Sequence, residues 1–309
     1  FVEDLELRNP RAGEQPVLVL RARCYEREAM PFKALDGVMD ALARHLLRLD
    51  ELLVGHMLPV HLPELARAFP ALERLPSVRR LLQPFPPRGA ASRERERAEL
   101  ALFELLRRCA GHSPVVIWID DLQWGDLDSV RILKSWIESD ESLPIMLVLS
   151  YRGEERDGNA CLKLLASAEP SAHAVQSELG VSPLAATDVE SLCQSTLGAL
   201  APSHGSLVDR IVREARGSPF LAWQLVTLAQ ARIAQGETDL SPSIDGLVSQ
   251  LSALLREPER ALLNVLAVAG RPIAPKLALE AARIRHKGRS QLHALRGLGL
   301  IRLRIADEQ

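Results

Sequence analysis

The sequence predicts an α/β fold in which a parallel sheet is followed by helical domains. The apolar run at 115–119 shows no polar alternation, which is typical of a strand buried on both faces of a parallel sheet. Two further short apolar runs, at 17–20 and 145–149, indicate a second buried strand and another apolar strand. Segments with helical periodicity separate these runs, and such alternation favours a parallel sheet. Beyond Pro183 the strand pattern stops until the last residues. We therefore expect an α/β core over 1–181, a helical lid over 182–240 and a third domain over 241–309.

Composition narrows the class of protein. The 309 residues are 47% apolar and 25% charged, as in ordinary soluble proteins of two or three domains. The net charge of −2 gives no general electrostatic reason to bind nucleic acid or a membrane surface. No apolar run is long enough to span a bilayer, and no signal peptide is visible. The four cysteines are far apart and form no CxxC pair, so we expect buried thiols in a reducing, cytoplasmic protein without a zinc site.

The first strand, 17–20, runs into the charged stretch RARCYERE. Its charged residues either form a network over a site or are a solvated strand end; they are Arg21, Arg23, Glu26 and Arg27. A helix is expected from Pro31, where proline suits the first turn. Seven prolines between 51 and 91 predict short helices and turns. A long helix should then run from Ser92 to a glycine stop at Gly111.

The central strand ends in two adjacent acids within the stretch VVIWIDDLQWGD, residues 115–126. Ligands of open α/β sheets sit beyond the carboxyl ends of the strands, where Asp120 and Asp121 are expected. A hydrophobic strand ending in Asp is also how P-loop ATPases hold Mg²⁺. We therefore predict that Asp120 binds Mg²⁺ and that Asp121 orients or deprotonates the attacking water. The alternative is that both acids cap the next helix, but Asp126, Asp128 and Ser129 lie nearer its start.

The third strand, Ile145–Leu149, ends in Ser150, Tyr151 and Arg152. The planar fork of an arginine suits a phosphate oxyanion, so Arg152 is a candidate sensor of the terminal phosphate. Its alternative role is an ion pair with an acid; the candidates are Glu154, Glu155 and Asp121. A helix near 162–168 and a weak strand near Val175–Leu179 should complete the α/β layer.

The second half reads as helices. Thr187 with Glu190 predicts a capping box, and Gly217 with Pro219 predicts a stop and restart between two helices. Further helices are expected at 244–255, 259–269, 276–283 and 289–298. Ile301–Ile305 alternates with arginines like a strand, which suggests a winged helix truncated within its wing. Its later part is basic and suits either DNA or an intramolecular docking face.

Four stretches together carry a resemblance: IDDLQWGD, LPIMLVLSYRGEE, RCYERE and, at 217–220, GSPF. They resemble the ATPase module of the STAND branch of AAA+ proteins, as found behind bacterial serine/threonine protein kinase domains and in large LuxR-type regulators. The similarity spans nearly the whole chain. It implies a partial P-loop core that binds ATP or ADP with Mg²⁺, held by Asp120. It also implies Asp121 and Arg152 as catalytic residues and Gly217 and Pro219 beside the adenine.

One departure from the family is severe, because no GxxxxGK[ST] loop occurs in the sequence. Since the numbering also opens on Phe1, we expect a piece of a longer protein that begins just after that loop and is inactive by itself. The resemblance implies a slow ATPase switch in intracellular signalling, with a kinase domain upstream, helical repeats downstream and nucleotide-dependent oligomers. Two alternatives stay open, a DNA-binding ATPase of the initiator or regulator class and a non-hydrolysing scaffold.

Overall fold

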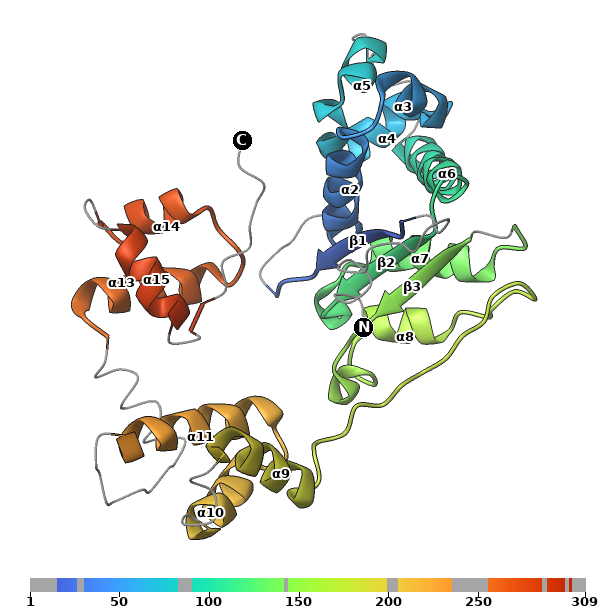
Figure 1. The fold of residues 1–309 in the computed structure, drawn as a ribbon. Coiled ribbons are helices and arrows are strands. Elements are labelled where there is room, and N and C mark those ends of the chain that lie inside the picture. The colour runs from blue at the N-terminus through green and yellow to red at the C-terminus, as the bar shows by residue number, and fades with distance from the viewer. Residues whose placement is uncertain are drawn as a thin grey trace. The chain divides into compact units, whose positions relative to one another are not determined.

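A computed structural model of the chain describes residues 16–26, 31–82, 91–141, 144–198, 205–234, 255–284, 288–297 and 300–301. The chain divides into two compact units, Phe1–Glu178 and Leu179–Gln309. Each unit is described by itself below, with the element labels of Figure 1.

The first unit is built on three parallel strands in the order β1 (Leu18–Arg23), β2 (Val115–Asp120) and β3 (Ile145–Leu149). Their register places Leu20 beside Ile117 and Ile117 beside Leu147. The central strand is buried on both faces over Val115–Ile117, as its unbroken apolar run predicts. This sheet, with its helices (Figure 1), confirms the α/β class.

The helices of the first unit confirm the short, proline-broken elements expected between 51 and 91. After β1 come α2 (Lys33–Leu46), α3 (Glu51–Met57), α4 (Leu62–Ala68), the 3-10 turn η1 (Pro70–Arg74), α5 (Pro76–Leu81) and the long α6 (Ala91–Ala110). After β2 come η2 (Leu122–Trp124) and α7 (Leu127–Glu138), and after β3 come η3 (Gly153–Glu155) and α8 (Ala160–Ala166).

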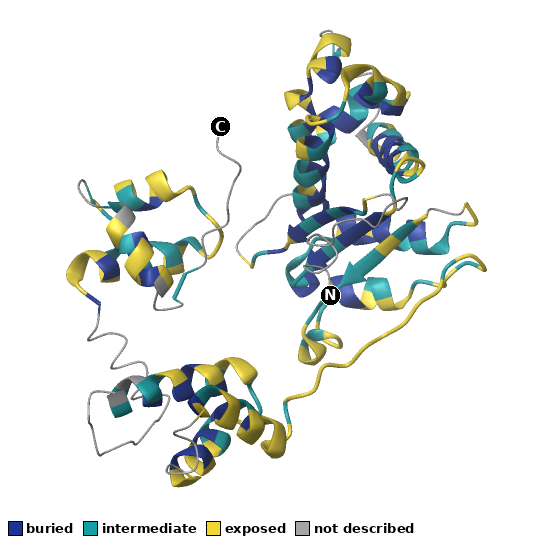
Figure 2. Ribbon diagram, viewed as in Figure 1, coloured by how far each residue is buried: buried dark blue, intermediate teal, exposed yellow. Residues whose placement is uncertain are grey.

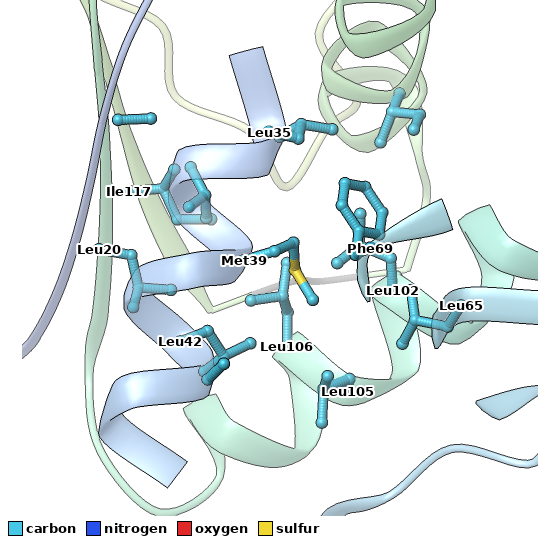
Figure 3. Packing of buried hydrophobic residues seen from close by; sticks show 14 of the residues in the cluster. Leu20, Leu35, Met39, Leu42, Leu65, Phe69, Leu102, Leu105, Leu106 and Ile117 are labelled. Carbon is cyan, nitrogen blue, oxygen red and sulfur yellow. The ribbon is translucent and has the colours of Figure 1, made fainter. Parts of the chain in front are cut away.

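Helix α2 packs on the sheet through one face and on further helices through another. Figure 3 shows Leu35, Met39 and Leu42 of α2 between the strand residues Leu20 and Ile117 and the side chains of α4 and α6. The approach to β1 is close, because a Cβ at Gly37 would lie 3.0 Å from the Cβ of Ala22. This core places the carboxyl ends of β1 and β2 side by side.

Asp126 joins α7 to the start of α2. Its carboxylate caps α7 by accepting hydrogen bonds from the Ser129 amide at 2.9 Å and the Ser129 hydroxyl at 2.6 Å. It also accepts bonds from the backbone amides of Phe32 at 3.1 Å and Ala34 at 3.2 Å. Asp126, one of the three residues that lie nearest the helix start in the sequence, is therefore the cap, and Asp120 and Asp121 remain available for other roles.

The strand predicted near Val175–Leu179 is wrong. Residues 167–185 contain neither helix nor strand and are mostly exposed (Figure 2). Val175 is fully exposed. Hydrogen bonds attach this segment at several points. For example, the Ser171 amide donates to the Ile137 carbonyl at 3.1 Å, and the Tyr151 hydroxyl donates to the Glu178 carboxylate at 2.6 Å. A strand needs a neighbouring backbone, and among the described residues β3 pairs with β2 alone.

The second unit contains helices around two separate apolar clusters. The first cluster joins α9 (Ala186–Leu197), α10 (Gly205–Ala215) and α11 (Pro219–Ala234) through residues such as Val189, Ile211 and Leu225. The second joins α13 (Glu257–Ala269), α14 (Pro275–Ala281) and α15 (Gly288–Gly297). No described helix is both long and apolar enough to cross a membrane.

The capping box predicted at Thr187 is wrong, because α9 begins after Ala185 and its first turn has no side-chain cap. Thr187 therefore lies inside the helix, and its hydroxyl does not occupy the capping position. The helix expected at 244–255 and the strand expected at 301–305 lie almost wholly outside the described residues. The winged helix and the boundary at 240 accordingly stay predictions.

Candidate functional site

The carboxyl ends of the three strands bring the predicted site residues of the first unit to one edge. Arg23 is the register partner of Asp120, and Ile119 is that of Leu149, so Ser150 follows beside Asp120. Backbone bonds continue past the strands, from the Cys24 amide to the Asp120 carbonyl at 3.0 Å and from the Leu122 amide to the Ser150 carbonyl at 2.9 Å. The edge is thus held by backbone geometry.

The two acids accept hydrogen bonds from different side chains, but both face the Arg23 guanidinium. Asp120 accepts a hydrogen bond from the Ser150 hydroxyl on Oδ1, at 2.5 Å. Asp121 accepts one on Oδ1 from the side-chain amide of Gln123, at 3.0 Å. The Oδ2 atoms of both acids approach the guanidinium of Arg23, at 3.7 Å for Asp120 and 2.6 Å for Asp121. Two carboxylates therefore converge on one positive group.

The backbone of Asp121 is in the left-handed region, with φ of +56°. A non-glycine residue in this region is uncommon and costs free energy, although aspartate tolerates it better than most residues. The turn brings the Asp121 amide to the Ser150 hydroxyl, at 3.3 Å. This turn lets two consecutive residues, which a regular strand would point to opposite faces, share one cation.

The fit of the edge to Mg²⁺ follows from this arrangement. Mg²⁺ prefers oxygen ligands and takes only one or two carboxylates from a protein, completing its shell with water and phosphate oxygens. The Arg23 guanidinium shows that both Oδ2 atoms can face one cation. No described group of three or more His, Cys, Asp or Glu residues could enclose a metal. The acid pair fits a nucleotide-bound Mg²⁺ better than a protein-enclosed metal.

Gln123 is a site residue that the sequence did not single out. It is 3% exposed, and its side-chain oxygen accepts a bond from the Arg152 backbone amide at 3.3 Å. Its backbone carbonyl accepts a bond from the Asn159 side chain at 2.7 Å. Gln123 therefore connects Asp121 to the loop after β3. In the sequence, the signal for this role was that Gln123 is a polar residue between the apolar residues Leu122 and Trp124.

Arg152 lies at this edge, but its side chain is not the one that pairs with the acids. Within the described parts of the chain, its guanidinium forms no ion pair with Glu154, Glu155 or Asp121. Arg23 occupies the position beside Asp121 instead. Of the four charged residues that could form a network or a solvated strand end, Arg23 pairs with the site acids. The Arg152 side chain is exposed, and its phosphate role stays a prediction.

The cysteines offer no nucleophile. All four are buried and free. Burial raises the pKa of the Cys24 thiol to about 12 and that of Cys109 to about 11. These thiols are protonated at neutral pH, which makes them poor nucleophiles and metal ligands.

Gly217 and Pro219 lie in the second unit, where the structure gives them local roles. Gly217 has φ of +77°, and a Cβ there would lie 2.7 Å from the Leu184 carbonyl oxygen. The Leu184 amide donates to the Gly217 carbonyl at 2.8 Å. Ser218 caps α11 by accepting a bond from the Leu221 amide at 3.3 Å, and Pro219 is the first helical residue. Their adenine contact stays a prediction.

Replacing Gly217 with alanine should destabilise the helices α9–α11 by about 1–3 kcal/mol, because the new Cβ meets the linker backbone and the left-handed conformation is strained. Urea unfolding followed by circular dichroism would measure the loss. Gly205→Ala is the matched control, since nothing lies within 4 Å of a Cβ there. Equal stability of the two variants would contradict a structural role for Gly217.

Comparison with known proteins adds little. No family model and no curated protein sequence matches the chain. Among solved structures, the chain is similar to a point mutant of RuvB from Thermotoga maritima, with 14% identity and a TM-score of 0.31, over 94% of this chain and 81% of that one. A TM-score of this size assigns the chain to no family.

Proposed function

We propose that the chain is the acid-bearing part and lid of an ATP-dependent regulatory switch of the STAND branch of AAA+ proteins. The observation that carries the proposal is the convergence of the Asp120 and Asp121 carboxylates on one cation at the carboxyl edge of a parallel sheet. Parallel sheets bind their ligands at this edge, and the strand-end acid is where P-loop ATPases hold Mg²⁺.

Each site residue then has a role in the proposed switch. Asp120 would hold the Mg²⁺ that accompanies ATP, oriented by the hydroxyl of Ser150. Asp121 would orient the attacking water, oriented in turn by Gln123. Arg152, whose side chain is exposed at the same edge, would contact the terminal phosphate. Pro219 would contact the base, which ADP and ATP share, while only the terminal phosphate of ATP would reach Arg152. The two nucleotides would therefore favour different arrangements of lid and core.

The switch needs a phosphate-binding loop, and the 309 residues contain no GxxxxGK[ST] sequence. The loop must therefore come from outside these residues. The free edge of β3 supports a place for the strand that would carry it, because β3 pairs with β2 alone within the described chain. Tyr151 and Arg156 hold Glu178 near the carboxyl end of β3, so the segment before Glu178 would border the added strand.

The test is a calorimetric titration with Mg²⁺-ATP of the 309-residue chain and of a longer protein with about 40 preceding residues, enough for a strand and its loop. We expect binding by the longer protein and none by the chain alone. Micromolar, Mg²⁺-dependent binding by the chain alone would show that the loop is not required. Absence of binding by both would contradict the ATP switch and favour the scaffold alternative.

The signalling context is part of the same proposal and rests on the resemblance alone. We infer a protein kinase domain or a transcription-regulator domain as the output, with helical repeats as the sensor. Direct DNA binding is not favoured, since the chain carries a net charge of −2. A strongly salt-dependent affinity for duplex DNA would support the DNA-binding alternative instead.

A further inference from the structure

We propose that Arg23 competes with Mg²⁺ for the two site carboxylates, so that the cation can bind only when this guanidinium leaves. The inference rests on the proposed function and adds a regulator to the same site. Arg23 Nη2 lies 2.6 Å from Asp121 Oδ2, and Arg23 Nε lies 3.7 Å from Asp120 Oδ2. The guanidinium thus stands where a metal bound to Asp120 Oδ2, with its water held by Asp121 Oδ2, would have to bind.

The remaining oxygens of the acids are already engaged. Ser150 donates to Asp120 Oδ1 and Gln123 donates to Asp121 Oδ1, and Gln123 is itself buried. The Oδ2 atoms are therefore the ones that face a shared cation, and both face Arg23. A Mg²⁺ ion binds carboxylate oxygens at about 2.0–2.1 Å, so it would lie close enough to the guanidinium for strong repulsion. Metal and arginine exclude each other.

Arg23 cannot release the acids by losing its proton. Burial lowers the pKa of Arg23, but the hydrogen bond to Asp121 and the charges of Asp121 and Asp120 outweigh it, so the pKa is raised. The group stays charged at any physiological pH, and it has to move away to release the acids. Its side chain is 45% exposed, and its guanidinium carbon lies 5.8 Å from the centre of the Tyr25 ring. The Tyr25 ring already lies beneath the guanidinium, so its face can stay in contact with the cation when the cation leaves the acids.

Movement of Arg23 would report the state of the site to β1. The next residue, Cys24, donates its amide to the Asp120 carbonyl, so the end of β1 is joined directly to the metal-binding strand. A metal that displaces Arg23 would free a positive charge at the start of the stretch CYERE, while an empty site would keep it bound. The same arginine thus neutralises the paired acids when no metal is bound.

The experiment titrates Mn²⁺ alone, as a paramagnetic substitute for Mg²⁺, and follows the free-ion resonance by electron paramagnetic resonance. We expect Arg23→Gln to bind Mn²⁺ about tenfold more tightly than the wild-type chain. Arg23→Lys keeps the positive charge and should stay close to wild type. Arg131→Gln is the matched control, since Arg131 pairs with Asp128 at 2.9 Å away from the acid pair.

Three results would overturn the proposal: equal or weaker binding by Arg23→Gln, equally tight binding by Arg23→Lys, or no binding by any variant. A second measurement uses only wild-type protein, so its result does not depend on whether a variant folds. In wild-type protein labelled with ¹⁵N-arginine, Mg²⁺ should shift the Arg23 Nε signal and leave that of Arg131 in place. An unmoved Arg23 signal at saturating metal would also refute the proposal. Failure of the ATP switch would appear separately, as absent ATP binding by the longer protein.

Discussion

Replacing Asp121 with asparagine should slow ATP hydrolysis about a hundredfold in the longer protein that carries a phosphate loop, with ATP binding close to normal. Asparagine keeps the shape of the side chain but removes the charge that would orient and accept a proton from the attacking water. Hydrolysis is measured under single-turnover conditions, and ATP binding is measured by calorimetry. Asp120→Ala should instead weaken the Mg²⁺-dependent part of ATP binding, because it removes the proposed metal ligand.

Asp128→Asn is the control for this experiment. Asp128 lies in the same stretch of chain, but its carboxylate pairs with Arg95 and Arg131 on the surface. The Asp128→Asn variant should hydrolyse ATP at the wild-type rate. Equal rates for wild type and Asp121→Asn would exclude Asp121 as the water-positioning residue and leave the metal role of Asp120 open.

Replacing Asp126 with alanine should destabilise the first unit by at least about 3 kcal/mol. The change removes the cap of α7 and the acceptor of the Phe32 and Ala34 amides, 94 and 92 residues away in sequence. Phe32 has a left-handed backbone, with φ of +59°, which needs such support. Urea unfolding followed by tryptophan fluorescence measures the loss, since Trp118, Trp124 and Trp136 all belong to this unit.

Two further variants separate capping from cross-linking. Asp126→Asn keeps an acceptor oxygen and should recover part of the lost stability. Asp128→Ala removes only exposed ion pairs and should cost less than about 1 kcal/mol. If Asp126→Ala were no more harmful than Asp128→Ala, the bonds between Asp126 and the start of α2 would contribute nothing to the stability of the first unit.

The sequence alone predicted the elements whose pattern is local. The unbroken apolar runs at 115–119 and 145–149 form neighbouring parallel strands, and the acids that follow 119 lie at the ligand edge. The sequence also indicated that a residue among Asp126, Asp128 and Ser129, and not Asp120 or Asp121, caps the next helix, and Asp126 is that cap. The strand predictions succeed because an unbroken apolar run is a pattern of residues within a few positions of each other.

Tertiary structure alone decided which partners the site residues have. Arg23, and not Arg152, pairs with Asp121, because the parallel register sets Arg23 beside Asp120 across about a hundred residues of sequence. Gln123 links Asp121 to the loop after β3 because the Arg152 backbone amide in that loop donates to its side-chain oxygen. Among the residues that the structure describes, the weak strand expected at 175–179 has no neighbour with which to pair, and apolar composition alone supplies no hydrogen bonds. Register and long-range pairing depend on where distant backbones meet, and no local pattern encodes that meeting point.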